Sequence, residues 1–378
     1  MEGATGFPDA FGEFLKKQGA HLTYIRFPFF NSISKSIWVE KYVGEKQLSR
    51  RRSWIRFYQP QLLSFAKDFT WLMTVGWPLV WRADFVLVSN NLLGLAALIF
   101  RKLGLIRRFT YLVVDYSPRR FNNPLVEWVY VFLDRLIATH ADSVWTMAIA
   151  MLEGREKDGR LKMSEVNYRL APMGNNSHIL FAGGNLPFQK HDLVYVGNPN
   201  TKNVRADLLI DVVNILRQRQ ISFRLHFVGP GETQYLKQKA QQLNLQDDVI
   251  FHGSIPDTLD MERYLASCGI GLAPYDSTLK DNFSKYADPS KIKIYLGCGL
   301  PVITTGVPPI ATDLENAGAG LIAEFSPEAF ANAIEQLWRN DDDYSRKRSA
   351  AREMGQTFSW PSIFDRLMHE EGLYSAHQ

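Results

Sequence analysis

The sequence has only two cysteines, Cys268 and Cys298, among its 378 residues. Two thiols are too few for a metal-ligand set or a disulfide framework. We therefore expect both to be small buried side chains of a protein in a reducing compartment. The sequence also lacks a run of 18 uninterrupted apolar residues, so it predicts no transmembrane helix.

A secretory signal is missing as well. The first residues include Glu2, Asp9 and Glu13 and no long apolar run, which is not typical of a signal peptide. We expect a cytoplasmic protein that is soluble or lies peripherally on the inner face of a membrane. The net charge of +4 is mild, and we expect no nucleic-acid partner. Hydrophobic residues make up 46% of the chain, which excludes a disordered polymer.

Strand and helix patterns alternate along the whole chain, which predicts an α/β fold with parallel sheets. Residues 181–187 are rich in glycine and end in proline, as linkers are, and the alternation then begins again. The pattern predicts two Rossmann-like domains, residues 1–180 and 188–340, followed by a helical segment at 341–378.

The first domain begins abnormally for this class. A helix is expected at residues 9–17 and a strand at 21–27, but only a glycine-rich stretch that includes Gly3 and Gly6 comes before them. A Rossmann-like domain starts with a strand before such a turn. We therefore expect that the first strand is missing and that the N-terminus is truncated or its start misassigned.

Glycines follow three consecutive strands of the second domain: Gly197, then Gly229 and Gly231, then Gly253. Ligands of open α/β sheets bind beyond the carboxyl ends of the strands, where glycine lets backbone N–H groups approach a phosphate. Any one of these glycines could equally be an ordinary turn residue. Three strand ends of this kind together favour the ligand site.

Residues 288–303 form the most specific stretch. Ser290 is expected to cap a helix, and Lys291 is expected in its first turn, with backbone N–H and ammonium near a bound anion. A cation at a helix N-terminus opposes the helix dipole, so stability does not explain Lys291, whereas a diphosphate ligand does.

This stretch resembles the P-x-K-x-x-E-Y-x-A-x-G-x-P-V-I signature of GT-B glycosyltransferases of the family-4 type, the glycosyl transferases group 1. Three more segments resemble strand ends of the family's donor domain, namely residues 193–197 followed by Lys202, residues 227–231 and residues 249–256. Residues 171–175 resemble the P-x-G-x-D hinge between the two domains.

The resemblance implies a GT-B fold, in which the N-terminal domain binds the acceptor, the C-terminal domain binds the donor, and the C-terminal helices return toward the N-terminal domain. The donor would be a nucleotide-diphosphate sugar, with UDP the expected nucleotide. The acceptor would be a glycan or lipid-linked intermediate of cell-surface polysaccharide synthesis. No metal or cofactor is expected, because the lysine and helix N-termini offset the leaving diphosphate charge.

Carried over residue by residue, the resemblance assigns donor binding to Gly197, Asn198, Lys202, Gly229, Gly231, His252, Ile255, Tyr286, Ser290, Lys291 and Tyr295. It assigns Gly6, Arg119 and Arg120 to the acceptor side. The two arginines could hold an acidic or pyrophosphate-bearing acceptor, or they could be solvated surface residues.

Two departures from the family pattern bear on mechanism. Retaining members have a pair of glutamates where this chain has Tyr286 and Ile294. Loss of the second glutamate while the lysine stays is similar to the glucuronosyltransferase of xanthan assembly, an inverting, membrane-associated relative. Asp115, at the end of a predicted strand, would then be the catalytic base, although it could instead cap a turn with Ser117.

A basic and aromatic stretch at residues 46–81 has three interpretations. It could lie on an anionic membrane, bind single-stranded nucleic acid, or be aromatic core with a solvated arginine face. Two other function classes stay open: a sugar-nucleotide epimerase of the same architecture, and a non-catalytic nucleotide-sugar-binding protein. A hydride-transfer enzyme is disfavoured, because no G-x-G-x-x-G follows a strand.

Overall fold

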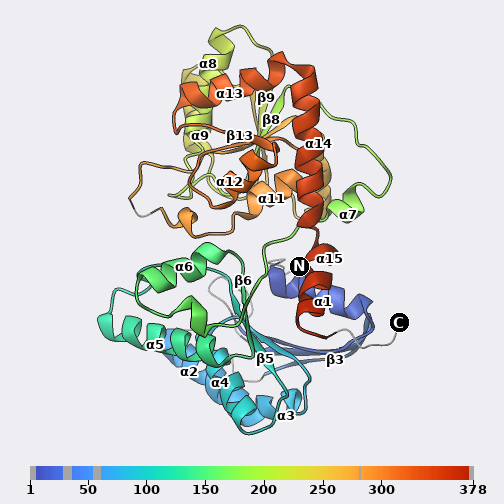
Figure 1. Cartoon of the computed structure of the whole chain (residues 1–378). Helices are drawn as coiled ribbons and strands as arrows, with labels where there is room; N and C mark the ends of the chain where they lie inside the picture. The colour runs from blue at the N-terminus through green and yellow to red at the C-terminus, as the bar shows by residue number, and fades with distance from the viewer. Residues whose placement is uncertain (1–5, 29–35, 54–60, 281, 374–378) are drawn as a thin grey trace. The chain divides into compact units, whose positions relative to one another are not determined.

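The computed structural model describes residues 6–28, 36–53, 61–280 and 282–373. The chain divides into two compact units, which we describe separately (Figure 1). Unit 1 comprises Met1–Ala171 and Arg366–Gln378, and unit 2 comprises Pro172–Asp365. The last residues of the chain thus belong to the first unit, as the resemblance implies.

Unit 1 contains a parallel sheet of four strands in the order β4-β5-β6-β7. Its strands are β4 (Val86–Val88), β5 (Phe109–Val113), β6 (Ser143–Thr146) and β7 (Tyr168–Leu170), and its main helices are α4 (Asn91–Lys102), α5 (Pro124–His140) and α6 (Ile149–Lys157). Every residue of β5 is buried, as expected for a central parallel strand. All of these elements except α6 were predicted from the sequence to within a few residues.

A second, antiparallel sheet in unit 1 was not predicted. It consists of β1 (His21–Arg26), β2 (Trp38–Val43) and β3 (Lys46–Arg52), and the turn between β2 and β3 contains Gly44 at φ +54°. Strand β3 was not predicted because its residues are almost all polar and exposed, so it lacks the alternation of apolar and polar residues that indicates a strand. The helices α2 (Gln61–Trp71) and α3 (Trp77–Val80) and the π-helical turn between them, Leu72–Gly76, follow.

The N-terminal helix α1 (Phe7–Lys17) starts after Gly6, whose backbone is extended. Phe7 and Phe11 of this helix pack edge-on against the buried Trp145 of β6. Within the described residues, β4 is an edge strand of the parallel sheet and β1 pairs only with β2. The missing first strand stays a prediction.

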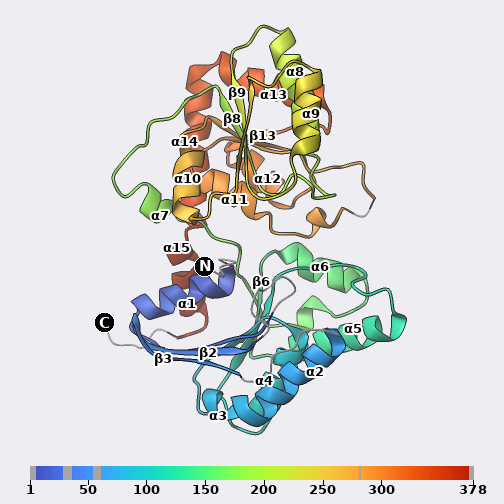
Figure 2. The same cartoon turned by 180° about the vertical axis from the view of Figure 1, so that it is seen from behind.

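The last helix, α15 (Trp360–Glu370), brings the chain back to unit 1 (Figure 2). The indole of Trp145 donates a hydrogen bond of 2.9 Å to Glu371 Oε1, and Arg366 donates one of 2.7 Å to the Leu170 carbonyl at the end of β7. These contacts tie the C-terminal residues to the parallel sheet of unit 1.

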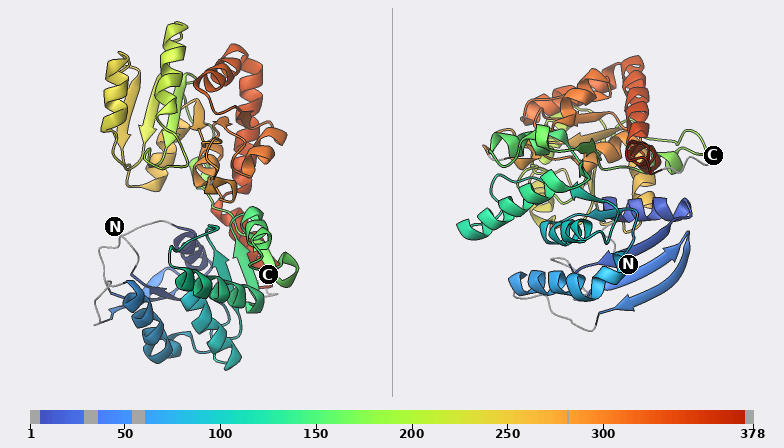
Figure 3. Two further views of the ribbon diagram at one scale, coloured as in Figure 1. Left: turned by 90° about the vertical axis from the view of Figure 1, so that its left-hand side faces the viewer. Right: turned by 60° about the horizontal axis from the view of Figure 1, so that its bottom comes forward.

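Unit 2 is built on a six-stranded parallel sheet in the order β10-β9-β8-β11-β12-β13, with helices on both faces (Figure 3). The strands are β8 (Asp192–Val196), β9 (Arg224–Val228), β10 (Val249–Gly253), β11 (Ile270–Ala273), β12 (Val302–Thr304) and β13 (Gly320–Ile322). The helices are α7 (Ser177–Leu180), α8 (Leu208–Gln218), α9 (Gln234–Gln242), α10 (Thr258–Ala266), α11 (Ser290–Gly297), α12 (Ile310–Asn316), α13 (Pro327–Arg339) and α14 (Asp341–Thr357).

Both cysteines lie in the core of unit 2 as free, buried thiols, as predicted. Burial raises the pKa of Cys268 to about 12, so the thiol is not a ready nucleophile. The six strands were all predicted, and α7, α10 and α12 were not, because short helices give too few turns for a clear apolar period.

Candidate functional site

The glycines after β8 and β9 form one tight backbone corner in unit 2. Gly197 has φ +117° and Gly229 has φ +140°, conformations that side chains rarely allow. A Cβ on Gly229 would lie 2.7 Å from the carbonyl oxygen of Gly197. A Cβ on Gly231 would lie 2.5 Å from Asn198 Oδ1. The predicted residues Gly197, Asn198, Gly229 and Gly231 are therefore close together at the carboxyl ends of two neighbouring strands.

Lys291 lies at the same corner. A Cβ on Gly197 would be 3.5 Å from the Lys291 ammonium. The ammonium donates a hydrogen bond of 3.0 Å to Tyr195 Oη and lies 4.1 Å from the centre of the Tyr195 ring and 5.9 Å from that of Tyr275. Among the ion pairs of the described residues, none involves Lys291. The sequence identified the lysine but missed both tyrosines, although Tyr195 lies two residues before Gly197.

The surroundings of Lys291 disfavour its charge. Burial lowers the pKa of its ammonium to about 7, because the surrounding tyrosines offer a neutral oxygen and ring faces but no negative charge. A desolvated cation without a counter-ion is costly for the fold. An anion bound at this corner would supply the missing counter-ion.

The start of α11 differs from the prediction. The helix begins at Ser290 itself, the N-cap residue is Pro289, and no side chain caps it. Ser290 was therefore wrongly predicted as the cap; the proline before it fixes an extended backbone that leads directly into the helix. The uncapped helix N-terminus is adjacent to Lys291, where its first N–H groups add positive potential.

Two buried contacts hold α11 in place. Lys293, in the same first turn, forms a buried ion pair with Asp288, and the Met173 N–H donates a bond of 2.6 Å to the other oxygen of Asp288. Tyr295 Oη accepts a bond from the Val196 N–H at 2.6 Å and donates to the Leu272 carbonyl at 3.1 Å. Tyr295 is fully buried with its hydroxyl occupied, so it positions the strand ends and does not face a ligand.

For three more residues predicted to bind the donor, the described contacts include none with this corner. Lys202 is exposed on the loop after β8, and no ion pair of the described residues includes it. Tyr286 is half-buried at the end of a short 3-10 turn, with the Lys285 ammonium 5.1 Å from its ring centre. Ile255 packs against the core of unit 2. Contact of these residues with a donor stays a prediction.

His252 belongs to a polar cluster formed by residues of β10, β9 and α10. Its Nε2 lies 3.1 Å from His226 Nδ1, and the Tyr264 hydroxyl is 2.8 Å from both nitrogens. Burial, with His226 beside it, lowers the pKa of His252 and so favours the neutral ring. The neighbouring Gly253 connects the cluster to the corner, because its carbonyl accepts the Gly229 N–H at 2.8 Å.

The predicted catalytic residue, Asp115, lies in unit 1, just beyond the end of β5. Its carboxylate is exposed and receives a bond of 2.5 Å from the Arg120 guanidinium. Ser117 Oγ donates instead to the Arg119 carbonyl at 2.9 Å, so the described contacts include no turn cap between Asp115 and Ser117. The Arg119 guanidinium donates to backbone carbonyls of the following loop.

The basic and aromatic stretch at 46–81 is not one continuous surface. Arg50 on β3 pairs with Glu40 at 3.0 Å and lies over the Trp38 ring, whereas Trp71 is buried. Trp77 and Trp81 are exposed, and residues 54–60, with Trp54 and Arg56, lie outside the described residues. The part that the structure describes thus contains both packed and exposed aromatics.

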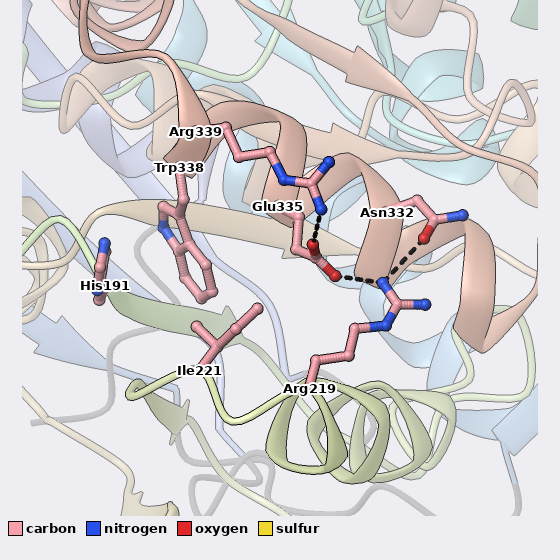
Figure 4. Close-up of a pocket in the computed structure, with 7 residues that line it drawn as sticks. All are labelled: His191, Arg219, Ile221, Asn332, Glu335, Trp338 and Arg339. Atoms are coloured by element: carbon pink, nitrogen blue, oxygen red, sulfur yellow. Dashed lines mark hydrogen bonds and ion pairs between the residues drawn. The ribbon is translucent and has the colours of Figure 1, made fainter.

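A cavity of about 630 Å³ in unit 2 lies away from this corner (Figure 4). His191 and Ile221, which line it, precede β8 and β9, so the cavity is at the amino ends of the strands. Its carboxylate, Glu335, is held between the guanidinium groups of Arg219 and Arg339. Because both arginines already pair with Glu335, the cavity is a poorer anion site than the glycine corner.

The described residues include neither a metal-binding cluster nor a membrane-spanning helix. No group of three or more His, Cys, Asp or Glu side chains among them is arranged to hold a metal ion. Within the same residues, no helix combines the length and apolar character that crossing a bilayer requires.

Comparison with known proteins bears on unit 2. Residues 190–340 match the sequence profile of the family described as Glycosyl transferases group 1. This part of the chain is therefore similar to the glycosyl transferases group 1. It contains the glycine corner, Lys291 and the His252 cluster.

Two curated relatives match over part of their length. Chitobiosyldiphosphodolichol beta-mannosyltransferase of Debaryomyces hansenii is 30% identical over 155 residues, which is 39% of this chain and 31% of the relative. GDP-mannose-dependent alpha-(1-6)-phosphatidylinositol dimannoside mannosyltransferase of Mycobacterium tuberculosis is 28% identical over 169 residues, which is 44% of this chain and 40% of the relative. The chain thus matches less than half the length of either relative.

The solved structures support the fold of the whole chain. Anabaena Alr3699/HepE in complex with UDP aligns with a TM-score of 0.61 at 15% identity, over 82% of each chain. At this identity the likeness concerns the fold alone. Together with the two parallel sheets, it supports a GT-B fold with two Rossmann-like units, as the sequence resemblance implied.

The depressed pKa of Lys291 predicts a pH dependence of stability. The unfolded lysine has a pKa near its ordinary value of 10.5, whereas the folded one is about 7, so the unfolded state binds more protons between these values. Stability should therefore rise with pH from about 7 to 9, by at most about 1.4 kcal/mol per unit from this group. Urea unfolding of wild type and Lys291→Met should show this rise only in the wild type.

Lys291→Met should also be the more stable protein at pH 6, where the wild type must bury the charge. The exposed Lys280→Met is the matched control and should keep the wild-type pH profile. Identical profiles for wild type and Lys291→Met would mean that Lys291 is solvated in the folded protein.

Proposed function

We propose that this chain is a glycosyltransferase that moves a sugar from a nucleoside-diphosphate sugar to a glycan or lipid-linked acceptor. The main support for this proposal is Lys291, a half-buried lysine whose ammonium has no carboxylate partner among the described residues and lies next to Gly197 at the strand ends. The glycosyl transferase group 1 match over residues 190–340 supports the same assignment.

The chemistry of the corner suits a diphosphate leaving group. Breaking the bond between the sugar and the diphosphate adds a second negative charge to the terminal phosphate, and this charge must be stabilised in the transition state. Lys291 and the uncapped N-terminus of α11 provide positive charge there, and the glycines let backbone groups approach closely. This chain's own groups would therefore stabilise the departing charge.

The nucleotide remains a matter of proposal. The sequence resemblance favours UDP, and the solved relative named above contains UDP. The name of the Mycobacterium tuberculosis relative instead specifies GDP-mannose. The half-exposed end of β10, with His252 and Ile255, is the region where we place the base, and it does not by itself select uracil or guanine.

The names of both curated relatives support a lipid-linked acceptor. The Debaryomyces hansenii relative is named for a dolichol-linked sugar, and the Mycobacterium tuberculosis relative for a phosphatidylinositol mannoside. We propose that the chain works in the cytoplasm at the inner face of a membrane, where such acceptors are reached. Residues 46–81 are one proposed contact with anionic lipid, through the exposed Trp77 and Trp81.

We propose Asp115 as the general base and inversion as the stereochemical outcome, as in the xanthan glucuronosyltransferase that the sequence resembles. Tyr286 and Ile294 replace the glutamate pair of retaining members, and the exposed carboxylate of Asp115 has only its Oδ1 bonded to Arg120 in the described contacts. Arg120 and Arg119 are then placed to meet an acidic or pyrophosphate-bearing acceptor. The relatives' names include both a beta- and an alpha-mannosyltransferase and leave stereochemistry open.

A non-catalytic nucleotide-sugar-binding protein is the second candidate. The presence of Tyr286 and Ile294 in place of the two glutamates favours this candidate, because Ile294 cannot accept a hydrogen bond from a ribose hydroxyl. An epimerase of this architecture would need acid and base groups in both units around the anomeric carbon, and only Asp115 stands out.

Nucleotide binding should raise the melting temperature, because a ligand that binds only the folded state stabilises it. We expect a panel of UDP, GDP and dTDP, with their sugars, to contain one nucleotide that shifts the wild type. Lys291→Met should fold and lose that shift, whereas Lys280→Met should keep it. A Lys291→Met protein that retains full nucleotide affinity would refute the assignment of the donor site.

Asp115→Asn should lower the rate of sugar transfer by on the order of 10²–10⁴-fold and leave donor binding nearly unchanged, because the amide keeps the shape but cannot take the acceptor proton. Proton NMR of the product's anomeric signal should show inversion relative to the donor. Retention of configuration together with an active Asp115→Asn variant would return this chain to the retaining class. Nucleotide binding without any transfer would favour the non-catalytic candidate.

A further inference from the structure

An exposed apolar stripe runs along helix α5 of unit 1. It consists of Leu125, Trp128, Val129 and Phe132, which are 69%, 64%, 41% and 52% exposed. Their spacing of three and four residues places them on one face of the helix. The Trp128 and Phe132 rings stack on each other with centroids 5.7 Å apart. We call these four residues the α5 stripe.

The rest of α5 is anchored to unit 1 by its other face. Ile137 and Ala138 are buried, and Ile137 fills the space over Gly94 of α4, where a Cβ would lie 2.9 Å from its Cγ2. The Asn91 side chain donates a bond of 3.0 Å to the Tyr130 carbonyl. Helices α5 and α4 lie side by side in both main views (Figures 1 and 2). The stripe is therefore not the packing face of α5.

The charges around the stripe are mainly positive. Both acids of the helix turn away from it and are paired: Glu127 with Arg160 at 3.1 Å, and Asp134 with Arg155 at 2.8 Å in the core. The exposed charges at its two ends are Arg119 and Arg120 in the preceding loop and Arg135 one turn beyond Phe132. Arg119 appears in no ion pair of the described residues, Arg120 pairs with Asp115, and Arg135 pairs only loosely with Glu165 at 3.8 Å.

We propose that the α5 stripe docks this protein on an anionic phospholipid surface, with Trp128 and Phe132 entering the boundary between headgroups and acyl chains. A helix with exposed tryptophan and phenylalanine between arginines has the character of an interfacial helix. Each arginine near the surface of an anionic leaflet adds to the attraction. The inference rests on the proposed function in one respect: a lipid-linked acceptor would be reached at that surface. The exposed residues and charges that support it are independent of the donor site.

A second copy of this chain is the main competing occupant. A twofold interface through the stripe would place the same patch of both copies face to face and bring their arginines together without an exposed acid on α5 to offset them. An anionic bilayer offers the complementary charge. The observations therefore favour lipid.

The test is sedimentation of the full chain with vesicles of phosphatidylcholine alone or mixed with phosphatidylglycerol. We expect the wild type to bind the mixed vesicles and to be released by high salt. Trp128→Ser/Phe132→Ser should lower the partition coefficient at least tenfold. Leu103→Ser removes an equally exposed apolar side chain at the end of α4 and should bind as the wild type does.

Three results would overturn the inference. First, the stripe variant Trp128→Ser/Phe132→Ser could bind the mixed vesicles as the wild type does. Second, the double variant Leu48→Ser/Trp81→Ser, in the 46–81 stretch, could abolish binding while the stripe variant keeps it. The wild type could also fail to bind vesicles and form a dimer that the stripe variant converts to monomers in light scattering, which would make the stripe an interface between copies.

The nucleotide-induced shift in melting temperature, measured on the same variants, separates this inference from the proposed function. The stripe variant should keep that shift, which also shows that it folds. Stripe-dependent vesicle binding in a protein that no nucleotide stabilises would leave this inference standing and reject the proposed function.

Discussion

The arrangement of unit 2 around its candidate site depends on one unbalanced charge, the ammonium of Lys291. It lies among Tyr195, Tyr275 and the backbone of Gly197, and burial lowers its pKa to about 7. The neighbouring lysine on the same helix, Lys293, is treated differently: Asp288 pairs with it in the core. One helix turn thus contains a lysine that anchors the fold and a lysine that lacks a partner, and only the second has a charge to offer a ligand.

The supporting contacts explain how this costly position is maintained. Tyr295 bonds to both β8 and β11, and Asp288 receives the Met173 N–H, so α11 is fixed to the sheet and to the start of unit 2. The close approach of Gly229 to Gly197 leaves no room for a side chain at the corner. The helix is thereby fixed so that the Lys291 ammonium lies at the strand ends, bonded to Tyr195 Oη.

Much of unit 2 could be predicted from the sequence because its strands are continuous apolar runs that end in glycine. The corner formed by Gly197, Gly229 and Lys291 followed from the rule that parallel strands end at one edge of a sheet. The roles of Tyr195 and Tyr295 could not be predicted, since an aromatic residue in a strand or helix gives no sign of where its hydroxyl bonds. The cap at Ser290 was wrong because Pro289 already sets the backbone that a capping side chain would otherwise stabilise.

Unit 1 was harder to predict for physical reasons. Its β2–β3 hairpin has an exposed, arginine-rich strand, so the period of two is hidden. For α5 the sequence predicted a helix but not its orientation. Trp128 and Phe132 face outward, and a helical period alone does not say which of two apolar faces is buried. Asp115 was placed correctly at a strand end, but its pairing with Arg120 depends on a loop conformation that spacing does not reveal.

The central claim is that a nucleoside diphosphate supplies the charge partner of Lys291, and proton uptake on binding tests it most directly. At pH 8 the free lysine, with a pKa of about 7, is largely neutral, and the nucleotide's terminal phosphate is already ionised. Calorimetry of nucleotide binding at pH 8 in buffers of different ionisation enthalpy should show uptake of about one proton, which disappears at pH 6. Tight binding at pH 8 with no proton uptake would contradict the account.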